Sequence, residues 1–343
     1  MGHYVSVTNN NILKYIEDYD VLVCSMKPSR IKAKQLAILE LFFVLSRIGC
    51  IYITNGPLGD IKGVVSFFVD KKGIDLLKDA LKTVGYCDKF YLLDFFSRSN
   101  GSSKDLVSIN EMVWKRVPFS VSKYYEHDRR LYEEHSSHNR EFYIYGTDRT
   151  VKKVKGYRGD GSDTGRRALP VEDTRLMINL AAIGSGMVLF DPFAGSGGIL
   201  YEARYIDPSL VIISADIDAK LEPGLQTYAD IHYTMDARSV ELSGTKIDAI
   251  VTEVPFSTDV TRNVVEAFVH LSQFLQDNAR VVIMCAENQN HELRQCMESL
   301  HFTLFTEKPV NRKGTDVKIT VWYRSKEQVN RLMDLHQAVS SIH

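Results

Sequence analysis

The stretch Leu189–Leu200, with the sequence LFDPFAGSGGIL, decides the fold that we expect. An apolar run ends at Asp191, a glycine-rich turn follows, and a second apolar segment begins after the glycines. A strand, a glycine turn and a helix leave free backbone N–H groups at the helix N-terminus, where the anionic part of a cofactor can bind. The stretch therefore predicts a cofactor-binding turn at the end of a buried strand.

Segments of helical and strand character alternate from Val171 onward, which favours a parallel sheet with helices on both faces. The last two strand-like segments, FTLFTEKPV and DVKITVWYRS, flank the turn NRKG and predict an antiparallel hairpin. A doubly wound sheet that ends in such a hairpin resembles the class I methyltransferase fold. We therefore expect an α/β, Rossmann-like domain of this kind over residues 171–343.

The rest of the chain predicts a second domain, since 343 residues are long for a single one. Residues 1–110 carry strand-like segments and an amphipathic helix, so we expect a smaller N-terminal α+β domain there. Residues 111–170 alternate β-like and basic stretches and predict a connecting segment.

Composition excludes several classes of protein. The net charge of −1 excludes a polycation, so any surface for nucleic acid must be local. The longest apolar run, residues 36–53, is broken by Glu40 and Arg47 and does not predict a membrane span. Five scattered cysteines form no CxxC pair, so we expect no structural metal site and a reducing, cytoplasmic location.

The identity of the cofactor follows from the residues around the glycines. The phosphate-binding pattern GxxxxGK[ST] is absent, and the dinucleotide pattern GxGxxG is broken at Leu200. Asp191 would also repel a pyrophosphate. S-adenosylmethionine instead presents a sulfonium and an ammonium, which suit an acid, and a carboxylate, which suits the helix N-terminus. We therefore expect S-adenosylmethionine.

Two more acids fit the same cofactor. Asp216 ends the next strand-like segment and can accept both ribose hydroxyls, although enzymes that use NAD have an acid at the same place. Asp236 follows a short strand and is a candidate acceptor for the adenine amino group. The predicted cofactor-binding residues are Asp191, Phe193, Ala194, Gly195, Ser196, Gly197, Asp216, Ile217, Asp236 and Ala237.

The sequence DPFAGSGG of residues 191–198 resembles motif I of amino-group methyltransferases that act on nucleic acid. Together with the basic segment before it, it is most similar to the tRNA guanine-N2 methyltransferases, which often carry an N-terminal THUMP region. The resemblance extends over about residues 150–325, whereas residues 1–110 have no clear THUMP signature. It implies methylation of an exocyclic base amine, first of all guanine N2 in tRNA, and a small activator subunit as a further partner.

The resemblance also implies a catalytic turn of the pattern (Asp/Asn)-Pro-Pro-(Tyr/Phe) after the fourth strand. Its carboxylate or amide oxygen and a backbone carbonyl accept the hydrogens of the amine, its prolines stiffen the turn, and its aromatic ring stacks on the flipped base. This chain has VTEVPFST instead, in which Val254 replaces the first proline. The candidate catalytic residues are Glu253, Pro255 and Phe256.

This departure leaves three interpretations open. Glu253 is the acceptor in a reshaped pocket, or the enzyme has another target, or the chain is a degenerate member that binds RNA or a partner without catalysis. The catalytic turn follows motif I along the chain, an order that resembles the tRNA family and one class of adenine-N6 enzymes. A DNA adenine-N6 methyltransferase is therefore the alternative enzyme.

A basic segment precedes motif I. Residues 149–167 hold seven lysines and arginines against two aspartates, together with an aromatic ring at Tyr157. Such a mixture suits RNA, where charge attracts phosphates and rings stack on bases. The predicted substrate-binding residues are Tyr157, Arg158, Arg166 and Arg167. The histidines His127, His135 and His138 do not have the spacing of a zinc site, and we expect no metal.

Overall fold

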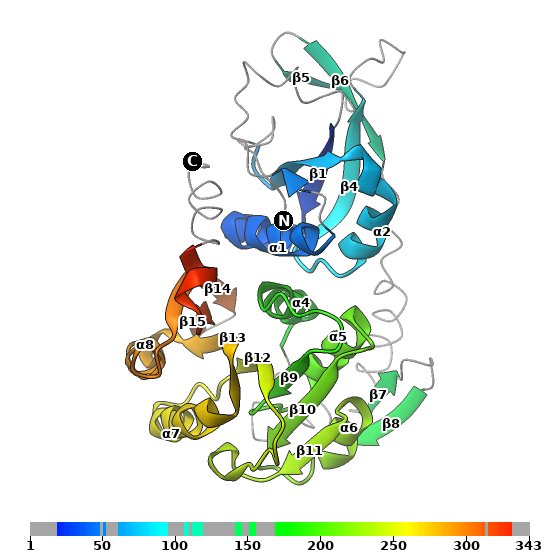
Figure 1. Cartoon of the computed structure of the whole chain (residues 1–343). Helices are drawn as coiled ribbons and strands as arrows, with labels where there is room; N and C mark the ends of the chain where they lie inside the picture. Colours follow the sequence, from blue (N-terminus) through cyan, green and yellow to red (C-terminus); the bar gives the residue numbers. More distant parts are fainter. Residues whose placement is uncertain are drawn as a thin grey trace. The chain divides into compact units, whose positions relative to one another are not determined.

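The computed structural model describes most of the chain in two compact units. The described residues are 19–48, 51–52, 61–94, 106–109, 112–118, 141–145, 151–155, 169–312 and 315–330. Those up to residue 118 belong to one unit, and those from residue 141 onward belong to the other. Each unit is described by itself (Figure 1).

The N-terminal unit is an antiparallel sheet with helices, which confirms its predicted α+β character. Its strands pair in the order β2-β3-β1-β4-β6-β5. They are β1 (Tyr19–Met26), β2 (Ile51–Tyr52), β3 (Val64–Asp70), β4 (Cys87–Asp94), β5 (Leu106–Ile109) and β6 (Met112–Pro118). The helices are α1 (Lys34–Arg47) and α2 (Ile74–Lys82), with short 3-10 turns at Pro28–Ala33 and Lys71–Gly73.

Glu40, which interrupts the apolar run of α1, is fully buried and has a structural role. Its Oε1 accepts a hydrogen bond from the backbone N–H of Gly85 at 2.6 Å, and its Oε2 accepts one from Tyr86 at 2.9 Å. A buried charge is tolerated when it is hydrogen-bonded in this way. The glutamate therefore fastens α1 to the segment that leads into β4.

The second unit contains a seven-stranded sheet with the order β11-β10-β9-β12-β13-β15-β14. The first five strands of this order, from β11 through β10, β9 and β12 to β13, are parallel. β15 runs antiparallel to β13, and β14 runs antiparallel to β15. This is the class I methyltransferase fold, as the sequence predicted. The strands are β9 (Val188–Asp191), β10 (Val211–Asp216), β11 (Ile231–Thr234), β12 (Ile247–Glu253), β13 (Leu275–Ala286), β14 (Thr303–Arg312) and β15 (Thr315–Tyr323).

Helices cover both faces of this sheet. Figure 1 shows α4, α5 and α6 on one face, and α7 and α8 on the other. Their bounds are α4 (Val171–Leu180), α5 (Gly198–Ile206), α6 (Glu222–Tyr228), α7 (Thr261–Leu271) and α8 (Asn290–Ser299). Short 3-10 turns occur at η5 (Ala237–Ser239), η6 (Thr258–Val260), η7 (Ser272–Phe274) and η8 (Glu287–Gln289), and a separate antiparallel pair is formed by β7 (Glu141–Tyr145) and β8 (Val151–Lys155).

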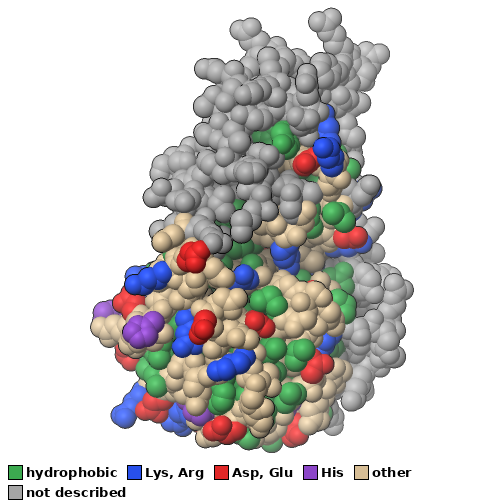
Figure 2. Space-filling view, in the orientation of Figure 1, with side chains coloured by type: hydrophobic (Ala, Val, Ile, Leu, Met, Phe, Trp, Pro, Cys, Tyr) green, Lys and Arg blue, Asp and Glu red, His purple; other side chains and the backbone are tan. Residues whose placement is uncertain are grey.

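The described surface is of mixed polarity. On the face that Figure 2 shows, acidic and basic side chains of the described residues are interspersed. None of the helices in the described ranges is long and apolar enough to cross a membrane.

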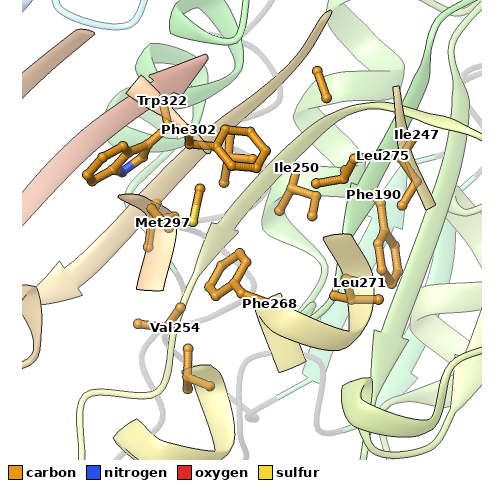
Figure 3. Packing of buried hydrophobic residues seen from close by; sticks show 14 of the residues in the cluster. Phe190, Ile247, Ile250, Val254, Phe268, Leu271, Leu275, Met297, Phe302 and Trp322 are labelled. Atoms are coloured by element: carbon orange, nitrogen blue, oxygen red, sulfur yellow. The ribbon is translucent and has the colours of Figure 1, made fainter. Parts of the chain in front are cut away.

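A hydrophobic core between the sheet and the helices α7 and α8 holds the strand ends in place. Phe190 of β9 and Ile250 of β12 are fully buried, and they belong to one cluster with Phe268 of α7 and Trp322 of β15 (Figure 3). Full burial of a side chain of this size contributes about 1.5–3 kcal/mol. The carboxyl ends of β9 and β12 are therefore anchored in a rigid layer.

Candidate active site

Acidic side chains gather at one edge of the parallel sheet. β9, β10 and β12 end at Asp191, Asp216 and Glu253, and Asp236 comes two residues after the end of β11. Because these strands are parallel neighbours, their carboxyl ends lie at the same edge. The strand order reverses between β9 and β12, and open α/β sheets bind ligands in the crevice at such a point. The structure thus brings the predicted acids to the edge where a cofactor would bind.

The glycine turn between β9 and α5 has a conformation that requires glycine. Gly195 and Gly197 have φ angles of +51° and +75°, in the left-handed region that few other residues adopt. The backbone N–H of Ala194 donates to the carbonyl of Ala215 at 3.0 Å, which ties the turn to β10. Helix α5 then begins at Gly198, with Gly197 as its N-cap. The N-terminus of α5 is therefore presented toward the crevice as the sequence predicted.

Asp216 has a role that the sequence did not reveal. Its Oδ2 accepts a hydrogen bond from the backbone N–H of Gly195 at 2.7 Å, and its Oδ1 accepts one from Asp218 at 2.9 Å. Each carboxylate oxygen has a second lone pair. Asp216 can therefore shape the glycine turn and still accept ribose hydroxyls.

Asp191 is buried at the mouth of the turn, with only 1% of its surface exposed. The pKa of Asp191 is raised to about 7, above all by burial; hydrogen bonds from Thr252 and Phe193 act to lower it, and the nearby Asp216 charge acts to raise it. Oδ1 of Asp191 accepts both bonds, at 2.7 Å from Thr252 Oγ1 and at 3.2 Å from the Phe193 N–H. A cation placed beside this carboxyl would favour its charged form.

Asp236 is held by Arg238, a residue that the sequence did not single out. The Arg238 guanidinium bonds Oδ1 at 3.0 Å and Oδ2 at 2.7 Å, and the Arg238 backbone N–H donates to Oδ1 at 2.9 Å. These side-chain hydrogen bonds lower the pKa of Asp236. Since Oδ1 already accepts two hydrogens, the remaining acceptor capacity lies on Oδ2. Arg238 also contacts Glu266 and Asn263 of α7, at 3.0 and 3.1 Å.

Apolar side chains flank these acids. Ile217 follows β10 with 71% of its surface exposed, and Met235 follows β11 with 38% exposed. Such side chains at the rim of the crevice provide an apolar face on which an aromatic base could lie. Ala237 and Ala194 are buried, and Phe193 packs partly against the hydrophobic core, so these three predicted residues support the turns mainly by packing.

The predicted catalytic turn leaves the sheet at the end of β12. Glu253 and Phe256 are half-buried and Pro255 is exposed. Val254 is 1% exposed and lies in the core cluster with Phe268 and Met297 (Figure 3). Its backbone N–H donates to the carbonyl of Met284 at 3.0 Å. Proline has no N–H and could not make this bond, so valine here extends the pairing of β12 with β13 by one residue.

The sequence also missed two side chains that support this turn. Thr252 joins the strand of Glu253 to Asp191, and Gln289 of η8 donates to the carbonyl of Pro255 at 2.8 Å. Both residues are buried and polar, and both are far from their partners in the sequence. No local sequence pattern marks such residues.

The predicted substrate-binding residues Tyr157, Arg158, Arg166 and Arg167 lie outside the described residues. Within the described part of the chain, no three His, Cys, Asp or Glu side chains are grouped as the ligands of a metal ion would be.

Parts of the chain are similar to known proteins. No family model matches the chain. A tRNA (guanine(10)-N2)-dimethyltransferase from Methanothermobacter thermautotrophicus is 38% identical over 89 residues, which cover 24% of this chain and 26% of that protein. The protein of the same name from Methanocaldococcus jannaschii is 33% identical over 143 residues, 37% of this chain and 40% of that protein. The predicted resemblance is confirmed.

A third relative, from Methanothermococcus thermolithotrophicus, is named "Probable tRNA (guanine(10)-N2)-dimethyltransferase" and is 28% identical over 40% of this chain and 91% of its own length. The chain thus spans about a quarter of the length of the first relative and about two fifths of the length of the second. Among solved structures, TrmN from Thermus thermophilus matches 89% of this chain and 100% of its own length, at 16% identity and a TM-score of 0.44.

Proposed function

We propose that the chain is a methyltransferase that uses S-adenosylmethionine and modifies an exocyclic amine of a nucleic-acid base, with N2 of a tRNA guanine as the acceptor. One observation supports this most directly. The acid of the glycine turn, Asp191, is hydrogen-bonded to Thr252, the neighbour of Glu253. A cofactor on the turn and a base at Glu253 would thus be held by one hydrogen-bonded unit at the crevice of a class I methyltransferase sheet.

The residues at the crevice fit S-adenosylmethionine. The N-terminus of α5 would hold its carboxylate, and Asp191, whose pKa burial raises to about 7, gains from the ammonium beside it. Asp216 would accept the ribose hydroxyls, and Oδ2 of Asp236 and the exposed face of Ile217 would meet the adenine. When bound, the cofactor supplies an electrophilic methyl group.

The chain's own residues would prepare the amine. The nitrogen lone pair of an exocyclic amine is delocalised into the base, which makes it a poor nucleophile. The Glu253 carboxylate and a backbone carbonyl of the turn would accept the two amine hydrogens, so that the lone pair is directed toward the methyl group. Phe256 would stack on the flipped base.

The RNA would be held by parts outside this crevice. We assign this role to the basic segment with Tyr157, Arg158, Arg166 and Arg167, and to the N-terminal domain over residues 1–110. Because β6 (Met112–Pro118) belongs to the sheet of the N-terminal unit, the connection to the methyltransferase domain would come after it. A small activator protein is a further candidate partner.

Transfer of labelled methyl groups tests this proposal. The protein is incubated with labelled S-adenosylmethionine and either bulk tRNA or genomic DNA, both from cells that lack the gene, and the labelled nucleosides are identified. We expect N2-methylated guanosine from tRNA. Label in DNA adenine would support the alternative enzyme. Binding of the cofactor without any transfer would support a degenerate member that binds RNA or a partner.

A further inference from the structure

The side chain of Gln289 joins the turn that follows β12 to the end of β13. This glutamine lies in η8, directly after β13, and only 1% of its surface is exposed. Its Nε2 lies 2.8 Å from the carbonyl of Pro255 and 3.2 Å from that of Ser257. A third acceptor, Thr261 Oγ1 at the start of α7, lies at 3.2 Å. The two amide hydrogens thus serve three acceptors on one turn.

The other end of the amide is fixed as well. Oε1 of Gln289 accepts a hydrogen bond from the backbone N–H of Ala286 at 3.1 Å, in the last residue of β13. Every polar atom of this buried side chain is therefore engaged. An amide in this position cannot rotate without leaving buried donors and acceptors unpaired, which is costly.

The turn after β12 lacks one of the residues that would stiffen it. In the methyltransferase pattern two successive prolines stiffen it, and here the first is replaced by Val254. The Val254 N–H pairs with Met284 and so fixes the start of the turn on β13. Gln289 reaches the carbonyls one and three residues later and fixes its remainder.

We propose that Gln289 is the positioning residue of the catalytic turn. Its hydrogen bonds to the carbonyls of Pro255 and Ser257 stiffen the turn, as the missing proline would have done. The stiffened turn keeps Glu253 and Phe256 aligned with the acceptor amine. This inference rests on the proposed function for its catalytic consequence, and on the contacts alone for the structure of the turn.

Two variants test it. Gln289→Glu keeps the size of the side chain but loses both N–H donors, and Gln289→Met keeps the length without a charge. We expect kcat for methyl transfer to tRNA to fall about 10- to 100-fold in both, because small misplacements of reacting groups are costly. The dissociation constant for S-adenosylmethionine should stay unchanged, since Gln289 touches none of the residues of the glycine turn. Gln295→Glu, at an exposed position of α8, is the matched control and should behave as the wild type.

Hydrogen–deuterium exchange gives a readout that does not depend on activity. The amides of residues 254–261 should exchange about tenfold faster in both Gln289 variants, because lost hydrogen bonds ease local opening. Residues 191–197 should exchange as in the wild type. Unchanged exchange at the turn would overturn the proposal, and so would an unchanged kcat or a loss of cofactor affinity in step with kcat. If the wild type transfers no methyl group, the proposed function fails, while the exchange data still decide whether Gln289 holds the turn.

Discussion

Thr252 Oγ1 donates a 2.7 Å hydrogen bond to Oδ1 of Asp191 and thereby joins the carboxyl ends of β12 and β9. Asp191 opens the glycine turn, and Thr252 directly precedes Glu253. The two functional parts of the crevice, which lie 61 residues apart in the sequence, are thus in direct contact.

Thr252→Val should shift the pH dependence of cofactor binding to higher pH. The lost hydrogen bond is one of those that lower the pKa of Asp191, so this pKa should rise above its value of about 7. At pH 7 more of the carboxyl is then neutral, and S-adenosylmethionine should bind about three- to tenfold more weakly than to the wild type, since one pKa unit corresponds to a factor of about ten. The difference should shrink at pH 9. Calorimetry at both pH values measures it, and Thr245→Val is the control. A difference that is the same at both pH values would contradict this role of Thr252.

Asp191→Asn should stabilise the protein without its cofactor at neutral pH. The folded pKa of Asp191, about 7, lies above its ordinary value of 3.8. Between these values the folded state binds a proton that the unfolded state has released, so stability falls as the pH rises through this window. The amide does not titrate. The free energy of unfolding of the variant should therefore exceed that of the wild type by roughly 2–4 kcal/mol at pH 8, and by much less at pH 4.

Thermal or denaturant unfolding at the two pH values measures this effect. Asp277→Asn, which changes an exposed acid of β13, should show no such pH-dependent gain. A variant that is less stable than the wild type at pH 8 would show that the Asp191 charge is favourable in the empty site.

Glu253→Ala should lower kcat about 100-fold or more, because it removes the oxygen that accepts an amine hydrogen. Glu253→Gln keeps an acceptor oxygen and should lose less activity. The affinity for S-adenosylmethionine should stay within about twofold of the wild type. Glu253→Asp should also lose activity, since the shorter side chain would misplace the acceptor oxygen. Asp259→Ala, an exposed acid of η6, serves as the control in the same steady-state assay. Full activity of Glu253→Ala would end the assignment of Glu253 as the acceptor.

Arg238→Gln should weaken binding of the adenosine part of the cofactor. Asp236 would lose the guanidinium that orients it, and the contact of Arg238 with Glu266 of α7 would be lost. Because the effect falls on the adenine side, S-adenosylmethionine and 5′-methylthioadenosine should lose affinity by the same factor. Asp191→Asn, in contrast, should weaken only the former, which has the amino-acid end. If Arg238→Gln bound each of the two compounds as tightly as the wild type does, the role given to Asp236 would be excluded.

The sequence predicted those features of the fold and site that depend on local order along the chain. The glycine turn, the strand ends at Asp191 and Asp216 and the final hairpin all depend on short patterns of apolar residues, glycines and turns. The structure describes each of them where it was expected.

The residues that support the site could not be predicted in this way. Thr252 and Gln289 meet their partners only through strand register and the path of distant turns. Arg238 binds the nearby Asp236, but it meets Glu266 of α7 in the same long-range way. A buried polar residue in a strand or turn looks the same in a sequence whether it has a partner or not. For the same reason the sequence showed Glu40 only as a break in an apolar run. It did not reveal that Glu40 accepts hydrogen bonds from two backbone N–H groups.

Calorimetric titration of S-adenosylmethionine into the wild type and into Asp191→Asn tests the central claim most directly. The account predicts one binding site per chain in the wild type at neutral pH. It also predicts an affinity at least about tenfold lower in the variant, which has lost the charge opposite the ammonium. Absence of binding to the wild type, or equal affinities of the two proteins, would contradict it.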